Sequence, residues 1–166
     1  MRVAAMRVLV LVLGSAACTP REQASPARRA EVAERGAQVM PFDLSKTKHV
    51  FESLPDGGLQ TVTAKQAGDT LQVRLIQEHL QQEAQRFSRG DFDDPMAIHG
   101  HEMPGVQQLR QGFSKLRVEY SARSDGGQIR YATTDSAMVG TLHRWFEAQR
   151  MDHGTGSQRA GEPGSQ

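Results

Sequence analysis

The chain has 166 residues, of which 20 are Lys or Arg and 19 are Asp or Glu, so its formal net charge is +1 at neutral pH. This length is enough for one domain of ordinary size. The nearly balanced charge lacks the basic surface that a nucleic-acid-binding protein needs, so we expect no nucleic-acid partner. Cys18 is the only cysteine, which excludes an intrachain disulfide and a metal site of several thiolates.

The N-terminal segment has the pattern of a secretory signal peptide. Arg2 and Arg7 precede the apolar run from Val8 to Leu13, which is too short to remain as a membrane-spanning helix. Small residues then lead to Cys18. The pattern predicts that residues 1–17 are removed, which leaves 18 basic against 19 acidic residues.

The cysteine that follows the predicted cleavage site resembles the lipobox of bacterial lipoproteins, in which the thiol is acylated. Ser15 stands where that motif usually has Leu, so a plain secretory cleavage after Ala17 stays open as an alternative. Lipid chains on Cys18 would be the contact with the membrane, because the chain has no polybasic segment to add affinity. Thr19 stands where an inner-membrane retention signal has Asp, which by resemblance to Gram-negative lipoproteins favours the outer membrane, with the protein on the periplasmic side of the cell envelope.

Composition then divides the remaining chain into three parts. Residues 18–40 are polar and rich in Ala, and we expect a mostly disordered tether with at most a transient helix around residues 27–35. Residues 154–166 are rich in Gly and Ser, which predicts a disordered tail. Residues 41–153 are predicted to form a single α+β domain.

This domain contains a duplicated pattern of two strands followed by a helix. Two segments of alternating apolar residues each carry the string Asp-Gly-Gly, at 56–58 and at 125–127, which is a strong hairpin signal. Asp69 and Asp135 are expected to cap the helices that follow, and the apolar residues of both helices fall at helical spacing. We expect a duplicated ββα unit: one four-stranded antiparallel sheet with two main helices on one face. Asp56 should then correspond to Asp125.

Residues 91–113 connect the two halves, and a short helix is predicted near residues 103–112. The segment 94–105, DPMAIHGHEMPG, is interrupted by Pro and Gly, which favours a loop over a helix. Three of its residues are apolar, and exposing them would forfeit about 1.5–3 kcal/mol of burial each. We therefore expect an ordered loop that packs against the C-terminal helix.

Between Met40 and Gly154 the chain resembles a family of small uncharacterised bacterial proteins. The resemblance rests on the strings HVFE, DPMAIHG, MPG and LHRWFEAQRMDHG. Some relatives carry the label aspartate carbamoyltransferase. The sequence does not support that label, because the Ser-Thr-Arg-Thr loop and the His-Pro-x-Gln segment of that enzyme are absent. The resemblance implies a shared fold and no established activity.

Candidate metal ligands cluster in the connecting segment. His99, His101 and Met103 would project to one side of an extended chain, and His143 on the last helix is a possible fourth ligand. Imidazole and thioether ligands suit copper, so copper is the cofactor that this pattern suggests. The alternative is a structural turn, in which His99 bonds to the backbone and Met103 packs in the core.

The other histidines have plainer interpretations. His79 is expected to be half-buried on its helix, His49 to be a solvated strand end, and His153 to cap the end of its helix. The sequence favours an exported, lipid-anchored envelope protein that acts as a binding or accessory module. The alternative is a small enzyme that uses His99, Asp94 and His143 as acid and base groups.

Overall fold

The structure is a computed structural model that describes residues 24–66 and 68–153. The predicted signal peptide, Cys18 and the predicted tail 154–166 lie outside the described residues. The elements in chain order are α1 (Pro26–Val39), a 3₁₀ turn (Leu44–Lys46), β1 (Thr47–Leu54), β2 (Gly57–Ala64), α2 (Thr70–Phe87), α3 (Asp93–His99), α4 (Val106–Gln111), a second 3₁₀ turn (Phe113–Lys115), β3 (Arg117–Arg123), β4 (Gly126–Ala132) and α5 (Ser136–His153).

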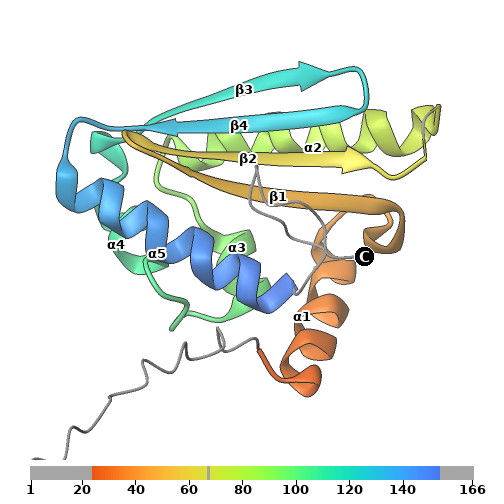
Figure 1. Cartoon of the computed structure of the whole chain (residues 1–166), viewed down its shortest axis with the longest axis horizontal. Coiled ribbons are helices and arrows are strands. Elements are labelled where there is room, and N and C mark those ends of the chain that lie inside the picture. Colours follow the sequence, from red (N-terminus) through yellow and green to blue (C-terminus); the bar gives the residue numbers. More distant parts are fainter. Residues whose placement is uncertain (1–23, 67, 154–166) are drawn as a thin grey trace, which may run out of the picture.

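The four strands form one antiparallel sheet in the order β1-β2-β4-β3, as the duplicated pattern predicts. The α+β prediction is therefore confirmed. Figure 1 shows the helices gathered beneath one face of the sheet. Helix α2 packs on β3 and β4, whereas α5 packs on β1 and β2. Each helix thus covers mainly the hairpin of the other half, which interlocks the two halves into one domain.

The glycines of the two hairpins lie at opposite ends of the β2–β4 pairing, where Gly57 pairs with Ala132 and Gly126 pairs with Thr63. Gly57 and Gly126 have φ angles of 149° and 159°. A Cβ atom on Gly57 would lie 2.1 Å from the carbonyl oxygen of Tyr131, and one on Gly126 would lie 2.1 Å from that of Val62. Only glycine fits both positions, which explains why the string recurs in both halves.

The aspartates before these glycines take equivalent positions. The carbonyl of Asp56 accepts a hydrogen bond from the Thr133 amide, and the carbonyl of Asp125 accepts one from the Ala64 amide, both at 2.9 Å. This reciprocity confirms the predicted correspondence between the two aspartates.

Both predicted helix caps are present. The side chain of Asp69 accepts a hydrogen bond from the Gln72 amide at 3.2 Å. Asp135 accepts from the amides of Ala137 and Met138 at 2.9 and 3.1 Å. These bonds satisfy amides that have no partner inside the helix and so fix where α2 and α5 begin.

The prediction of a mostly disordered tether over residues 18–40 is wrong for residues 26–39, which form α1. Ser25 caps this helix, Pro26 occupies its first turn, and Val32 is 1% exposed. The helix packs against α3 and α5. The domain boundary predicted at residue 41 is therefore too late, because one buried valine and the ion pairs of Arg28 hold an otherwise polar helix in place.

The prediction that residues 94–105 form a loop is also wrong in part, because Asp93–His99 is the helix α3. Pro95 lies in the first turn of the helix, where its missing amide removes no helical hydrogen bond. Gly100, with a φ angle of 89°, ends the helix. The predicted burial is confirmed, since Met96, Ile98 and Met103 are all nearly inaccessible to solvent.

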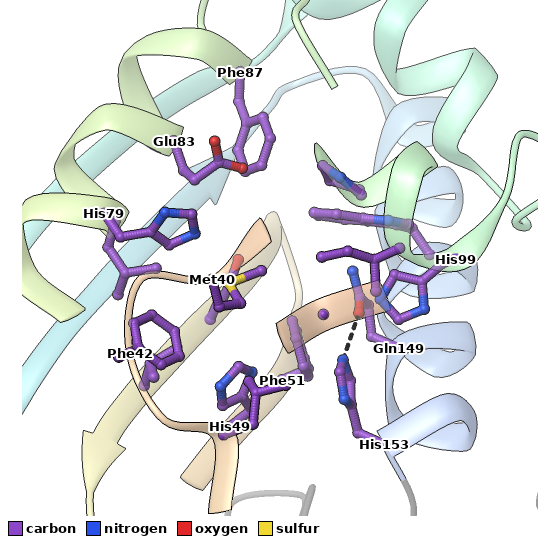
Figure 2. Close-up of a pocket in the computed structure, with 18 residues that line it drawn as sticks. Met40, Phe42, His49, Phe51, His79, Glu83, Phe87, His99, Gln149 and His153 are labelled. Atoms are coloured by element: carbon purple, nitrogen blue, oxygen red, sulfur yellow. Dashed lines mark hydrogen bonds between the residues drawn. The ribbon is translucent and has the colours of Figure 1, made fainter. Parts of the chain in front are cut away.

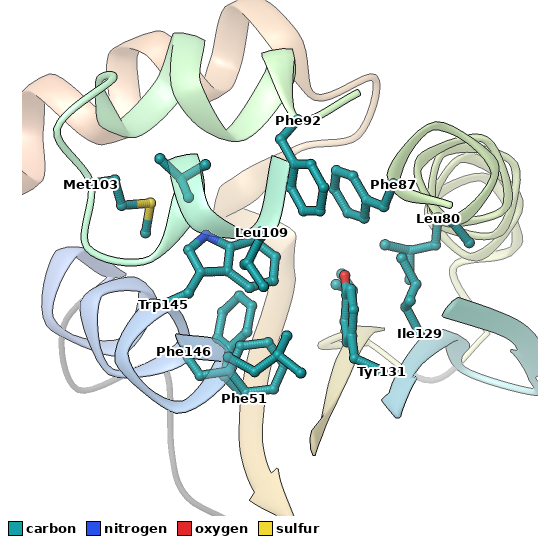
Figure 3. Packing of buried hydrophobic residues seen from close by; sticks show 14 of the residues in the cluster. Phe51, Leu80, Phe87, Phe92, Met103, Leu109, Ile129, Tyr131, Trp145 and Phe146 are labelled. Carbon is teal, nitrogen blue, oxygen red and sulfur yellow. The ribbon is translucent and has the colours of Figure 1, made fainter. Parts of the chain in front are cut away.

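Aromatic side chains form the centre of the core (Figure 3). Trp145 of α5 meets Tyr131 of β4 edge to face, with ring centroids 5.6 Å apart, and Phe87 of α2 stacks on Phe92 at 4.7 Å. These contacts join the sheet, α2 and α5 through one hydrophobic core. Among the described residues, no helix has both the length and the apolar character needed to cross a bilayer.

Candidate functional site: a histidine-lined cavity

A cavity of about 40 Å³ lies between the sheet and the helices beneath it (Figure 2). Four histidines from four different elements line it: His49 of β1, His79 of α2, His99 of α3 and His153 of α5. The remaining wall is mainly aromatic and aliphatic, with polar contributions from Glu83, Gln60 and Gln149. An apolar pocket with a few convergent polar groups is the usual form of a small-ligand site.

His99 is held by a buried hydrogen-bond network. Its Nδ1 lies 2.8 Å from Oδ2 of Asp152, and Arg28 of α1 donates to the same oxygen at 2.8 Å and to the His99 carbonyl at 2.6 Å. Burial alone would raise the pKa of Asp152, but the hydrogen bonds from His99 and Arg28 outweigh it and lower this pKa to about 2.

This network fixes the state of the His99 ring. The ionised Asp152 carboxylate can only accept hydrogen bonds, so Nδ1 carries the proton and donates it. In a neutral ring Nε2 is then an acceptor, and it has no hydrogen-bond partner within residues 24–66 and 68–153. A carboxylate that sets the tautomer in this way is a common means of presenting a histidine nitrogen to a ligand.

His153 lies between two other histidines. Its ring centroid is 5.1 Å from that of His99 and 5.4 Å from that of His49. Its Nε2 lies 3.2 Å from Oε1 of Gln149 on the same helix, as Figure 2 shows. Burial lowers the pKa of His49 to about 4, and burial also lowers the pKa of His153 well below its ordinary value. Both rings are therefore uncharged at neutral pH.

The opposite wall belongs to α2. Glu83 is 5% exposed, and burial, together with the nearby negative charge of Asp94, raises its pKa to about 8. Arg86 lies 3.2 Å from Glu83 but does not reverse this effect, because its guanidinium also binds Asp91 and Asp94. Burial lowers the pKa of His79 on the same wall. At neutral pH, His49, His153 and Glu83 are therefore uncharged, and their part of the cavity wall favours an uncharged occupant.

Two buried polar atoms in this region lack partners. Among the described residues, Nε2 of His49 and Nε1 of Trp145 are the buried side-chain nitrogen and oxygen atoms without a hydrogen bond. Both residues line the cavity. A buried polar atom without a partner is destabilising by about 1–3 kcal/mol, so two of them beside one cavity require an explanation.

The metal ligands predicted from the sequence do not come together. His101 is exposed, and Met103 packs in the hydrophobic core. His143 lies on the other side of α5, where its Nε2 is 2.9 Å from the Leu54 carbonyl oxygen and 3.0 Å from that of Gly57. Because α3 is helical through His99, His99 and His101 do not alternate along an extended chain as the prediction assumed, and copper binding stays a prediction. Within the described residues, no group of three or more His, Cys, Asp or Glu side chains is placed to hold a metal ion.

The alternative catalytic group of His99, Asp94 and His143 is not assembled either. Asp94 binds Arg86 at 2.5 Å. His143 precedes Asp152, the partner of His99, by nine residues on α5, which separates them by about 14 Å along the axis and places them on opposite sides of the helix. His143 therefore fastens α5 to the first hairpin instead of facing His99.

The sequence predicts structural roles for three of the residues that line the cavity, His49, His79 and His153. His49 is not a solvated strand end, because its ring shares the inner face of β1 with Phe51 and contacts His153. His153 does lie in the last turn of its helix, but its ring turns into the cavity. His79 is buried as expected. Alternation along β1 was a usable signal for His49, since it lies two residues before the core position Phe51.

No family model, curated protein or solved structure matches the chain. The resemblance to a family of small bacterial proteins therefore remains an expectation from the motifs, and the function must be inferred from the site itself.

Proposed function

We propose that this chain is an exported, lipid-anchored envelope protein whose folded domain binds a small ligand in the histidine-lined cavity. The signal-peptide pattern and Cys18 support export and anchoring. The cavity supports ligand binding. The protein is thus proposed to act as a binding module, with the acylated cysteine holding it at the periplasmic face of the outer membrane.

The observation that carries the binding proposal is the pair of buried nitrogens without partners, on His49 and Trp145. A ligand with one polar group would satisfy such an atom and would remove its unfavourable burial when it binds. A single ordered water is the competing explanation, because a cavity of about 40 Å³ holds roughly one water molecule.

The wall chemistry defines the part of the ligand that enters the cavity. Aromatic and aliphatic side chains favour an apolar group, and the uncharged His49 and His153 and the protonated Glu83 favour a neutral hydrogen-bonding group. The volume admits only the end of a short chain, about one methyl or methylene group, so the rest of the ligand must lie outside the cavity. Butyramide, which is neutral and carries one amide, is a suitable probe.

The experiment is a titration of the protein with butyramide, followed by fluorescence and by amide NMR spectra. Trp145 is the only tryptophan in the chain and lines the cavity, so its emission reports directly on the site. We expect saturable changes in Trp145 emission and in the amide signals around His49 and His153. His49→Leu should weaken binding about tenfold through loss of the polar contact.

The matched control is His101→Leu, the same substitution at an exposed histidine outside the cavity. It should bind butyramide as the unchanged protein does. Equal binding by the His49 and His101 variants, or no saturable change in the unchanged protein, would contradict the proposal and leave an internal water as the explanation.

Anchoring is tested separately by fractionating cells that express the full chain or its Cys18→Ser variant. We expect the unchanged protein in the outer-membrane fraction and the variant released into the periplasm. Retention of the variant in the membrane would refute acylation at Cys18 and would leave the proposal of ligand binding in the cavity unaffected.

A further inference from the structure

A second hollow, a groove of about 240 Å³, opens beside the cavity. It lies between α1 and the beginning of β1, and Leu44, His49 and His153 line both the groove and the cavity. Two histidines thus stand between an outer groove and an inner cavity. The two hollows therefore share part of their walls.

The groove is lined by cations. Arg29, Lys48 and Lys65 contribute to its wall, and Asp152 is the one acidic residue among its described lining. The charge of Asp152 is already paired with Arg28, at 2.8 Å, and hydrogen-bonded to His99. Arg29 and Lys65 therefore give the groove a positive character.

Arg29 is the most informative of these residues. It is half-buried, yet its guanidinium has no hydrogen bond and no ion pair with any residue in 24–66 or 68–153. By contrast Arg28, its neighbour on α1, is fully engaged with Asp152 and His99. Guanidinium groups that lose solvent normally bind a carboxylate or another oxyanion, so Arg29 lacks the partner that its position calls for.

Lys65 supports the same conclusion from the other wall. Its ammonium group donates to the Ser45 carbonyl at 2.9 Å, which holds the charge in place without neutralising it. Lys65 and Arg29 come from opposite sides of the groove, one after β2 and one on α1. Together they create a positive site directly outside His49 and His153.

We propose that the ligand is a short-chain carboxylate. Its carboxylate group lies in the groove against Arg29 and Lys65 and accepts a hydrogen bond from Nε2 of His49, and the end of its apolar chain passes between His49 and His153 into the cavity. The single negative charge of this carboxylate would pair with the half-buried guanidinium of Arg29. This assignment rests on the proposed function, since it names the chemical class of the ligand that the cavity binds.

Butyrate and butyramide form a matched pair of probes, because they share the same chain and differ in the charged head. The unchanged protein should bind butyrate about tenfold more tightly than butyramide, and added salt should reduce this preference. Arg29→Gln should abolish the preference while leaving butyramide binding as it was. Arg35→Gln, which removes the same charge from the same helix at a position outside the groove and paired with Glu31, should behave as the unchanged protein.

The outcomes separate the two proposals. Equal affinity for both probes, or an undiminished butyrate preference in the Arg29 variant, would overturn the carboxylate assignment while the cavity proposal stands. Displacement of butyrate by equimolar inorganic phosphate would show a general anion groove and also overturn it. Failure of both probes to change Trp145 emission would refute both proposals.

Discussion

The buried neutral histidines make the stability of the domain depend on pH in a way that one substitution isolates. Burial lowers the pKa of His49 from 6.5 to about 4 in the folded state. Below about pH 6.5 the unfolded chain binds a proton at this ring and the folded chain does not, so the free energy of unfolding falls as the pH falls. The loss is complete near the folded pKa of about 4.

The magnitude follows from the linkage relation. With pKa values of 6.5 and about 4, His49 lowers the free energy of unfolding by about 2 kcal/mol between about pH 7 and about pH 5. Other groups contribute in the same range, including Glu83, whose raised pKa acts in the opposite direction. The free energy of unfolding is therefore measured by urea unfolding at both pH values, for the unchanged protein and for His49→Leu. The contribution of His49 is the difference between the two proteins in how far this free energy changes with pH.

We expect the free energy of unfolding to fall by about 2 kcal/mol less in His49→Leu than in the unchanged protein over this interval. His101→Leu, which changes an exposed ring, serves as the control and should keep the full pH dependence. Identical pH dependence in the unchanged protein and His49→Leu would show that the ring is not buried in a neutral state, and the description of the cavity wall would be wrong.

Four further predictions concern packing and charge. Gly57→Ala should destabilise the domain by more than about 2 kcal/mol in urea unfolding, because its Cβ would lie 2.1 Å from the Tyr131 carbonyl oxygen. By contrast, Gly140→Ala inside α5, whose Cβ meets no atom closer than 3.6 Å, should stabilise it by about 0.5–1 kcal/mol. Arg28→Ala should accelerate amide hydrogen exchange in α1 by about tenfold, and unchanged exchange would contradict its role as the link to Asp152. The raised pKa of Glu83 predicts that stability falls as the pH rises from about 4.5 through about 8, and Glu83→Gln should remove that loss in unfolding measured between about pH 6 and 9.

The fold was largely predictable because its signals are local. The Asp-Gly-Gly strings mark both hairpins, since a backbone carbonyl of the opposite hairpin excludes any side chain at Gly57 and Gly126. The caps Asp69 and Asp135 mark both helix starts. What the sequence does not show is that each helix covers the hairpin of the other half, because that arrangement depends on how the two ββα units pack.

Helix α1 was not predicted, for a different physical reason. Most of its residues are polar, and few contacts hold it in place. The main ones are the burial of Val32 and the ion pair between Arg28 and Asp152. Composition averages over all residues of a segment and so misses a helix that is docked through two of them. Helix α3 escaped because Pro95 and Gly100 suggest a loop, although each is acceptable where it stands, one in the first turn and one just after the last.

The site could not be found from spacing along the chain. His99, His101 and Met103 are close together in the sequence, but only His99 reaches the cavity. Its neighbours there, His49 and His153, are fifty or more residues away and arrive on β1 and α5. Partners brought together by tertiary packing leave no local pattern, whereas the inward position of His49 beside Phe51 was readable from strand alternation.

The most direct test of the account is an NMR measurement of contacts between bound butyramide and the protein. If the cavity is the binding site, nuclear Overhauser effects should connect the methyl protons of butyramide to the ring protons of His49, His153 and Trp145. Contacts only to exposed side chains such as His101, or no contacts at saturating probe, would contradict the central claim that this domain binds its ligand among the buried histidines.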